Sequence, residues 1–588
     1  MMKNMIWAAL LMAALPQLAA AQVEKQVEVT KAYVPRVESA SKLAVEPDMT
    51  DTTQMRPEID YTITPLSLRT TLTTRPIRPA TVTYWEFNRP LPFYLKVGAG
   101  YPLNSVLDFY ATTQNPSTGY LMGYVNHVGR YADIRNDFGV ADNNSVRMMN
   151  RAGIAAGKYL GRHILEGELS YDNRMFHRYG GYASPGVEPL YAPGSRVDFG
   201  DANLMLRVGD DFQNLERTNF EVLLRGGMFF DHTEWPSVHG DPGRQLSIEG
   251  SARIARAFGR HRLSGTLGYE YLKGLKSFDG TDQGRFHAAL RYGFMGGVVR
   301  LEVGADYYRD RVESAADPDP IVETGNYIIP FAHLDFNLGT PGLKPFLEVD
   351  GSVDENSLRS LMYQNPYVAS EWLDRSSVNY NGRFGLNGTL WSNRFSYRAY
   401  AGFTIHDNHI YWMAFREVED DGAGTRSELF PGVFLPVMGC QTVTSFNGEI
   451  EYRPLSVLKF DLGVHGYVYN DEKKWCNGAP SFRGNLDIRY EGRKIAFGIG
   501  ADLQSRRTWN LYNTEILSDG DNAANVNSYL SRFEAPLAVD LHAEFDWKIS
   551  NRITFFAEGR NLINQRLYEY PWYPELGAHF TAGIKANF

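Results

Sequence analysis

Apolar and polar residues alternate along the C-terminal part of the chain. In residues 537–549 every odd-numbered position is apolar, and positions 540, 542, 544, 546 and 548 are Asp, His, Glu, Asp and Lys. Residues 579–588 repeat the alternation and end on Phe588. A β-strand directs successive side chains to opposite faces, so a period of two predicts strands with one apolar face and one polar face.

The same alternation recurs upstream, for example in residues 299–306, 458–465 and 482–489. A soluble β-sandwich also alternates, but a chain of this length would then need several domains with linkers between them. Here the pattern runs unbroken from about residue 93 to residue 588. It therefore favours an all-β fold, a transmembrane antiparallel β-barrel over 93–588 with lipid outside and a wet lumen inside. The charged positions predicted to face the lumen are Lys459, Asp461, Arg483, Asp487, Arg489, Glu544 and Asp546.

Turn signals give the number of strands. Ten tight connections are predicted at Pro116-Ser117, Gly161-Arg162, Gln213-Asn214, Gly259-Arg260, Gly296-Gly297, Pro341-Gly342, Ser392-Asn393, Pro454-Leu455, Gly492-Arg493 and Asn551-Arg552. With both barrel ends on the periplasmic side, ten such turns imply about 22 strands, within a range of 20–22. Longer outer loops rich in Pro, Gly, Asp and Trp are predicted at 181–197, 233–245, 313–325, 357–375, 417–434 and 508–533.

The N-terminus has the features of a secretory signal peptide. Lys3 supplies the positive charge, Ile6 to Leu15 form a short apolar core, and Ala19-Ala20-Ala21 offers a cleavage site. We therefore expect residues 1–21 to be removed. No later run of 18 apolar residues exists, which excludes an inner-membrane helical protein and favours the cell outer membrane.

Residues 22–92 differ in character from the barrel. Seven prolines occur between positions 35 and 90, alternation is poor, and no apolar set is large enough for an independent core. We interpret them as a short extended segment inside the barrel or beneath it in the periplasm, with a disordered linker as the alternative. Part of this segment, residues 57–91, is expected to narrow the pore.

Composition and motifs exclude several functions. A formal charge of −9 without a basic cluster gives no reason to expect nucleic acid as a partner. No catalytic triad, metal-binding His pair or phosphate loop is present, so we expect no enzyme activity, no cofactor and no metal site. His406 and His409 stand three positions apart, which in a regular strand directs them to opposite faces. The acidic stretches 417–422 and 519–522 suit calcium or, more simply, water.

The two cysteines, Cys440 and Cys476, are both expected on the extracellular side of neighbouring strands. Exported proteins meet an oxidising compartment, which favours a disulfide between them. Two free thiols in loops are the alternative.

One C-terminal stretch carries a family resemblance. Residues 556–565 read Phe-Ala-Glu-Gly-Arg-Asn-Leu-Ile-Asn-Gln, and with Phe588 and the count of about 22 strands they resemble the barrel of TonB-dependent receptors, in particular plug-poor barrels of Bacteroidetes. The resemblance implies TonB as a partner. Val27-Glu28-Val29-Thr30 is similar to a TonB box, which pairs with TonB by strand addition. Family receptors carry a plug of well over a hundred residues, whereas here only 22–91 precede the barrel.

Three functions follow from these patterns. The first is a TonB-receptor-like barrel that takes up a ligand too large for porins. The second is a non-transporting structural or assembly subunit that engages other envelope proteins, and the third is a passive channel. The sequence does not identify a ligand.

Overall fold

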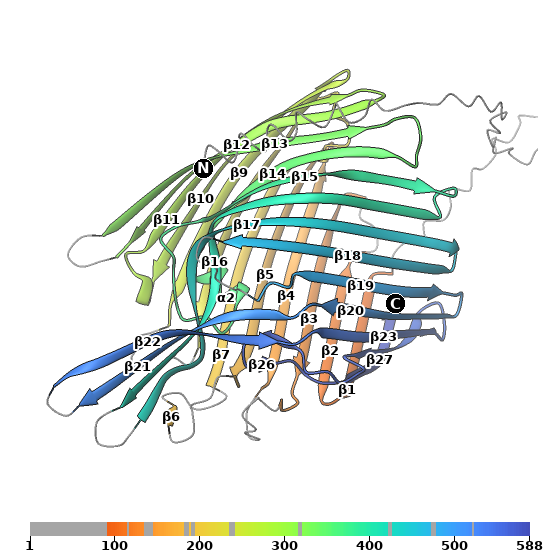
Figure 1. The fold of residues 1–588 in the computed structure, drawn as a ribbon. Helices are drawn as coiled ribbons and strands as arrows, with labels where there is room; N and C mark the ends of the chain where they lie inside the picture. The colour runs from red at the N-terminus through yellow and green to blue at the C-terminus, as the bar shows by residue number, and fades with distance from the viewer. Residues whose placement is uncertain are drawn as a thin grey trace, which may run out of the picture. The chain divides into compact units, whose positions relative to one another are not determined.

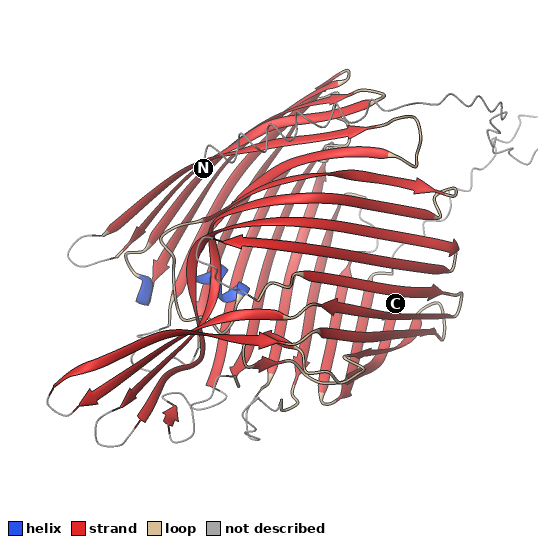
Figure 2. Ribbon diagram, viewed as in Figure 1, coloured by secondary structure: helices blue, strands red, loops and turns tan. Residues whose placement is uncertain are grey.

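The computed structural model describes residues 91–113, 117–134, 145–180, 187–189, 195–233, 242–315, 320–420, 426–471, 478–519 and 522–588. These residues are almost all in strands (Figures 1 and 2). The wall strands are β1 (Phe93–Tyr101), β2 (Asn104–Thr112), β3 (Gly119–Arg130), β4 (Arg147–Leu160), β5 (His163–Arg178), β7 (Ser195–Asp210), β8 (Asn219–Asp231), β9 (Arg244–Phe258), β10 (His261–Leu275), β11 (Asp282–Met295), β12 (Val299–Ser314), β13 (Ile321–Phe336), β14 (Lys344–Asp354), β15 (Ser377–Leu390), β16 (Phe395–Asp420), β17 (Arg426–Leu455), β18 (Leu458–Asp471), β19 (Phe482–Glu491), β20 (Ile495–Gln504), β23 (Ala538–Lys548), β24 (Ile553–Arg560) and β27 (His579–Asn587).

The wall strands form a closed antiparallel ring. The main sheet of the described residues has 25 strands. Three of them, β6 (Val187–Pro189), β21 (Arg507–Asp519) and β22 (Asn522–Ala535), lie outside the ring, so 22 remain in the wall. The ring closes where β1 pairs with β27, from Tyr94↔Asn587 to Tyr101↔Phe580. At the seam the backbone groups of Phe93 and Phe588 exchange two hydrogen bonds of 3.0 Å. Closure leaves no unpaired edge in the ring, which is what a barrel needs in lipid.

The prediction of about 22 strands is confirmed, because the predicted turns mark the strand ends. At one end of the barrel, the turn end, the connections are 113–118, 161–162, 211–218, 259–260, 296–298, 337–343, 391–394, 456–457, 492–494 and 549–552. Nine of the predicted turns fall within these connections. The tenth, Pro454-Leu455, immediately precedes its connection because β17 extends to Leu455. We call the opposite end the loop end.

One face of the wall strands is apolar and exposed. Leu267 on β10 is 58% exposed, Leu290 on β11 is 62% exposed and Ile328 on β13 is 67% exposed. Residues next to them in sequence carry the opposite face, where Arg291 bonds Asp306 at 2.9 Å. Exposed apolar side chains over strand after strand are the surface that a lipid bilayer covers.

Two segments predicted as loops are strands instead. Residues 417–420 and 426–434 continue β16 and β17 beyond the wall, and residues 508–519 and 522–533 belong to β21 (Arg507–Asp519) and β22 (Asn522–Ala535). β21 pairs in parallel with β16, and β6 (Val187–Pro189) pairs in parallel with β17. The loop prediction was wrong because these pairings join segments that are far apart in sequence, where local composition gives no signal. The result is an outer sheet in the order β6-β17-β16-β21-β22, which projects from the loop end in Figure 1.

The β21–β22 hairpin leaves the wall intact. Because β20 pairs directly with β23, from Ile495↔Trp547 to Gln504↔Ala538, the ring bypasses the hairpin. Helical structure among the described residues is limited to η3 (Lys276–Phe278) and α2 (Leu358–Gln364), shown in blue in Figure 2. Neither helix has the length and apolar character needed to cross a membrane.

Candidate functional site

The connection between β14 and β15, residues 355–376, folds back onto the wall, and we call it the inner loop. Its helix α2 begins after Ser357, whose side chain accepts a hydrogen bond from the backbone N–H of Ser360. Such an N-cap satisfies one of the free donors at a helix start. Leu358, Leu361 and Met362 then recur at helical spacing and are buried, so α2 presents an apolar face to its surroundings.

The inner loop lies inside the ring. Its buried residues pack in one cluster with Phe176, Phe199, Phe229 and Leu272 on β5, β7, β8 and β10, and with Phe434 and Leu511 on β17 and β21. Strands so far apart around a closed ring can be reached by one short segment only from within. Figure 1 accordingly shows α2 among the strands of the barrel.

A second loop packs against the inner loop and holds it in place. Residues 561–578, which we call the C-terminal loop, connect β24 to β27 and contain the short pair β25 (Tyr568–Tyr570) and β26 (Tyr573–Pro574). The ring of Tyr573 stacks on that of Tyr367 in the inner loop, with centroids 3.7 Å apart. The Tyr573 hydroxyl donates to the Gly432 carbonyl at 2.6 Å, and the Tyr570 hydroxyl donates to the Gln364 carbonyl at 2.7 Å. The two loops and β17 therefore form one buried unit at the loop end.

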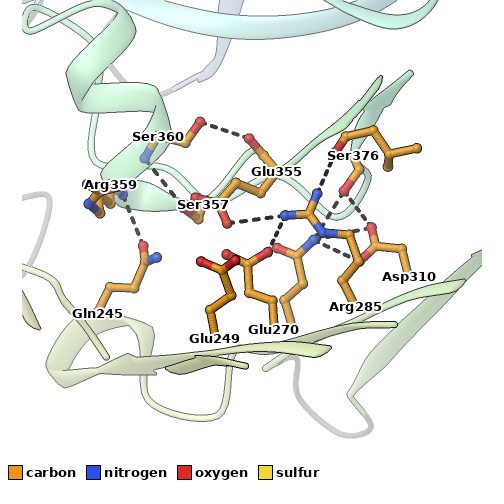
Figure 3. Close-up of polar contacts among 12 residues, drawn as sticks. Gln245, Glu249, Glu270, Arg285, Asp310, Glu355, Ser357, Arg359, Ser360 and Ser376 are labelled. Atoms are coloured by element: carbon orange, nitrogen blue, oxygen red, sulfur yellow. Dashed lines mark hydrogen bonds and ion pairs between the residues drawn. The ribbon is translucent and has the colours of Figure 1, made fainter. Parts of the chain in front are cut away.

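Polar contacts fix both ends of the inner loop to the wall (Figure 3). At its C-terminal end the Ser376 hydroxyl donates to Asp310 on β12, and the Gln283 amide on β11 donates to the same carboxylate at 3.0 Å. In α2 the Arg359 guanidinium bonds Asp201 on β7 at 2.6 Å, and the Arg359 backbone N–H donates to Gln245 on β9 at 3.0 Å.

A cavity of about 370 Å³ lies beside the inner loop. Residues that line it include Arg151, Glu168, Gln245, Glu249, Glu270 and Glu355. Within the described residues, the Gln245 Nε2 and Glu355 Oε2 atoms are buried without a hydrogen-bond partner. The cavity is therefore lined by polar groups of both wall and loop.

The charged residues predicted to face the lumen lie together in ion pairs and cavities. Lys459 bonds Asp461 at 3.0 Å, Arg489 bonds Glu544 at 2.9 Å, and Asp546 pairs with Lys585 at 2.8 Å. Asp487 pairs with His542 at 3.0 Å. Arg483 lines a cavity of about 590 Å³, and Asp461 lines a cavity of about 490 Å³. These seven residues thus lie among other charged and polar groups of the wall, and their position facing the lumen stays a prediction.

The two histidines do not follow the prediction from spacing. His406 and His409 on β16 have ring centroids 5.1 Å apart, so they do not point to opposite faces. The ladder with β17 shifts register between them, and Asn408 has a φ of 55°. A β-bulge of this kind inserts an extra residue and resets the alternation. No group of three or more metal-ligating side chains occurs among the described residues.

Several predicted features lie outside the described residues: the signal peptide 1–21, the segment 22–90, Val27, Glu28, Val29 and Thr30, and Cys476. Cys440 is described. It lies on β17 next to Gln441, which pairs with Asp471 at the end of β18, and its Sγ contacts Asp407 at 3.2 Å.

We expect a disulfide between Cys440 and Cys476, and it remains a prediction. The loop between them spans 36 positions, and its closure is expected to stabilise the protein by about 3–4 kcal/mol in the chain-entropy account. Mass spectrometry of unreduced, alkylated protein is expected to show neither cysteine modified, and the Cys440→Ser variant serves as the control with one reactive thiol. Alkylation of both cysteines in the unreduced protein would contradict the pairing.

Comparison with known proteins supports the fold. No protein-family model and no curated protein sequence matches the chain. Among solved structures, it is similar to the FrpB iron transporter from Neisseria meningitidis (TM-score 0.62, 10% identity, 85% of this chain and 82% of that one). It is also similar to the ferripyoverdine receptor of the outer membrane of Pseudomonas aeruginosa (TM-score 0.59, 12% identity, 85% and 72%). A third is the siderophore receptor PirA from Acinetobacter baumannii (TM-score 0.60, 9% identity, 84% and 80%). The chain therefore has the barrel fold of TonB-dependent outer-membrane receptors.

Sequence reasoning missed the inner loop as a structural element of the lumen. A signal was present, because Leu358, Leu361 and Met362 have helical spacing inside a segment predicted to be an exposed loop. An apolar helix face in such a loop needs a partner surface, and in this fold the inner wall supplies it.

Proposed function

We propose that this protein is an outer-membrane receptor that takes up a ligand too large for porins. The observation that carries the proposal is a 22-stranded barrel whose loop end is occupied by its own inner and C-terminal loops, with polar cavities next to them. A wide barrel closed in this way suits controlled passage better than free diffusion. Its likeness to iron and siderophore receptors and transporters is consistent with this class of function.

In this proposal the loop end faces the cell exterior and the charged face lines the lumen. Bacterial barrels carry short turns on the periplasmic side and longer loops outside, which is the distribution seen here. Lys459, Asp461, Arg483, Asp487, Arg489, Glu544 and Asp546 then line the lumen beneath the loops. A lumen wall that carries paired opposite charges stays hydrated, and it does not strongly favour ligands of either charge.

We further propose that residues 22–92 act from the periplasmic side. In the plug-poor Bacteroidetes-type arrangement, residues 57–91 narrow the pore and the segment around Val27 stays accessible to TonB. The support is compositional: 22–92 is too short for a family-type plug, yet Ile59, Tyr61 and Ile63 alternate well enough for a short strand.

Binding to TonB tests the energised form of this function. We expect the purified full-length protein to bind the periplasmic domain of TonB from the same organism in a pull-down and by calorimetry. Replacing Val27 and Val29 with proline is expected to weaken binding at least tenfold, because proline removes the backbone donors that strand addition needs. Proline at Ala40 and Ser41 is the matched control and should leave binding intact.

Absence of any TonB binding would favour the second candidate, a non-transporting structural or assembly subunit. The outer sheet β6-β17-β16-β21-β22 favours that candidate, because it extends well beyond the wall and presents a broad surface to other envelope proteins. A passive channel has less support, since the inner loop packs across the interior at the loop end.

A further inference from the structure

The N-terminal end of the inner loop places two carboxyl groups against one guanidinium. Arg285 on β11 bonds Glu270 on β10, and the same Nη2 lies 3.7 Å from Glu355, the first residue of the inner loop. The other terminal nitrogen of Arg285 donates to the Val353 carbonyl at 2.7 Å. Figure 3 shows the Glu270 and Glu355 side chains converging on Arg285 from the wall and from the loop.

The other charged groups around this pair have interaction partners of their own. Arg151 and Glu168, which line the same cavity, lie 4.0 Å apart. Glu249 on β9 bonds Arg225 at 3.1 Å, and Asp310 on β12 accepts from Gln283 and Ser376. Arg359 in α2 bonds Asp201, and Asp354 on β14 accepts from Ser352 and Asn379. Two carboxyl groups therefore share Arg285, which leaves one negative charge in excess when both are ionised.

The surroundings of Glu355 change the pKa of its carboxyl group. Burial and then the negative charge of Glu270 raise the pKa of Glu355 to about 7, although Arg285 and Arg359 oppose the rise. When the inner loop leaves the wall, the carboxyl returns to water and to an ordinary pKa near 4.5. The docked loop thus holds a proton that the released loop gives up. Docking is strongest below pH 4.5, weakens as the pH rises, and reaches its weakest level above about 7.

We propose that the inner loop is a lid that closes the barrel, that is held more tightly when Glu355 and Glu270 share a proton and that is released more often when both carboxyl groups are ionised. The apolar contacts of α2 hold the lid in either state, and the carboxyl pair sets how often it opens. The switch depends on the contact between loop and wall, whatever the barrel transports.

Spin-label mobility measures the position of the lid directly. A nitroxide is attached at Gln364→Cys, an exposed position on α2, in a background with Cys440→Ser and Cys476→Ser. In the full-length protein in lipid vesicles, we expect the ratio of mobile to immobile label to increase between pH 5 and pH 8. Because one proton is linked to release, the increase is at most tenfold per pH unit.

Two near-isosteric variants identify the groups. Glu355→Gln removes the titrating carboxyl, so the label is expected to stay immobile up to pH 8. Glu270→Gln removes only the second cause of the raised pKa of Glu355, so the pH dependence is expected to weaken but to persist. Glu313→Gln, which alters an exposed ion pair with Arg311 on the same wall, is the control and should keep the pH dependence. Heat-modifiable migration on gels verifies that each variant is folded. A label that is insensitive to pH in the unmodified protein, or a Glu355→Gln variant with unchanged pH dependence, would overturn the proposal.

Discussion

A variant in which a short Gly-Ser linker replaces residues 357–375 is expected to open the loop end of the barrel. This replacement removes α2 and the side chains that fill the interior there, including Leu361, Tyr367 and Trp372. It leaves every wall strand and the seam between β1 and β27 in place. Large barrels with nothing in the lumen conduct water and ions freely, so the conductance in planar bilayers is expected to increase strongly.

The experiment is best done as a two-by-two comparison with deletion of residues 57–80, the segment proposed to narrow the other end. If both ends are closed, either change alone gives a small increase and the double variant gives a large, steady conductance. If the inner loop alone closes the barrel, its replacement is sufficient. A wide pore in the unmodified protein would refute closure by the inner loop and would favour a passive channel.

Substitution of Tyr367 with alanine is expected to release the inner loop from the C-terminal loop. Tyr367 is 3% exposed and stacks on Tyr573, and its backbone carbonyl accepts from the Phe434 N–H at 3.0 Å. Loss of a buried aromatic ring costs about 3–5 kcal/mol, and here most of that cost falls on docking of the loop. Hydrogen exchange of α2 amides is expected to accelerate by two to three orders of magnitude, while exchange in the wall strands stays slow.

The matched control for this variant is Tyr367→Phe. It keeps the stacked ring and loses only the hydroxyl, so exchange in α2 is expected to change little by comparison. Equal acceleration throughout the barrel in the alanine variant would show that Tyr367 supports the wall itself rather than docking of the loop.

The wall could be predicted from the sequence because its signals are local. Alternation reports the two faces of a strand within a few residues, and Gly, Pro and Asn mark the turns where strands end. For example, Gly161 and Gly259 both have positive φ in two-residue turns, which is the conformation that glycine adopts most readily. The number of strands can therefore be predicted without knowing which residues far apart in sequence are in contact.

The closure of the loop end could not be predicted in the same way. It depends on contacts such as Arg359 with Asp201 and Tyr573 with Gly432, which join residues 158 and 141 positions apart. Nothing in the local pattern around any of these residues identifies its partner. The parallel pairing of β21 with β16 was missed for the same reason. The bulge at Asn408 is a different case, because a single extra residue reverses the face of every position that follows it.

The seam between β1 and β27 has a consequence for assembly. The paired residues Tyr94 and Asn587 are 493 positions apart, so the ring gains its last ladder of hydrogen bonds only when both ends of the barrel sequence have reached the membrane. Until then the growing sheet has two exposed edges, each able to pair with the wrong chain. The chain is therefore open to wrong pairing at these edges until the seam between β1 and β27 has formed. The hydrogen bonds between β1 and β27 therefore determine when folding of the barrel can be completed.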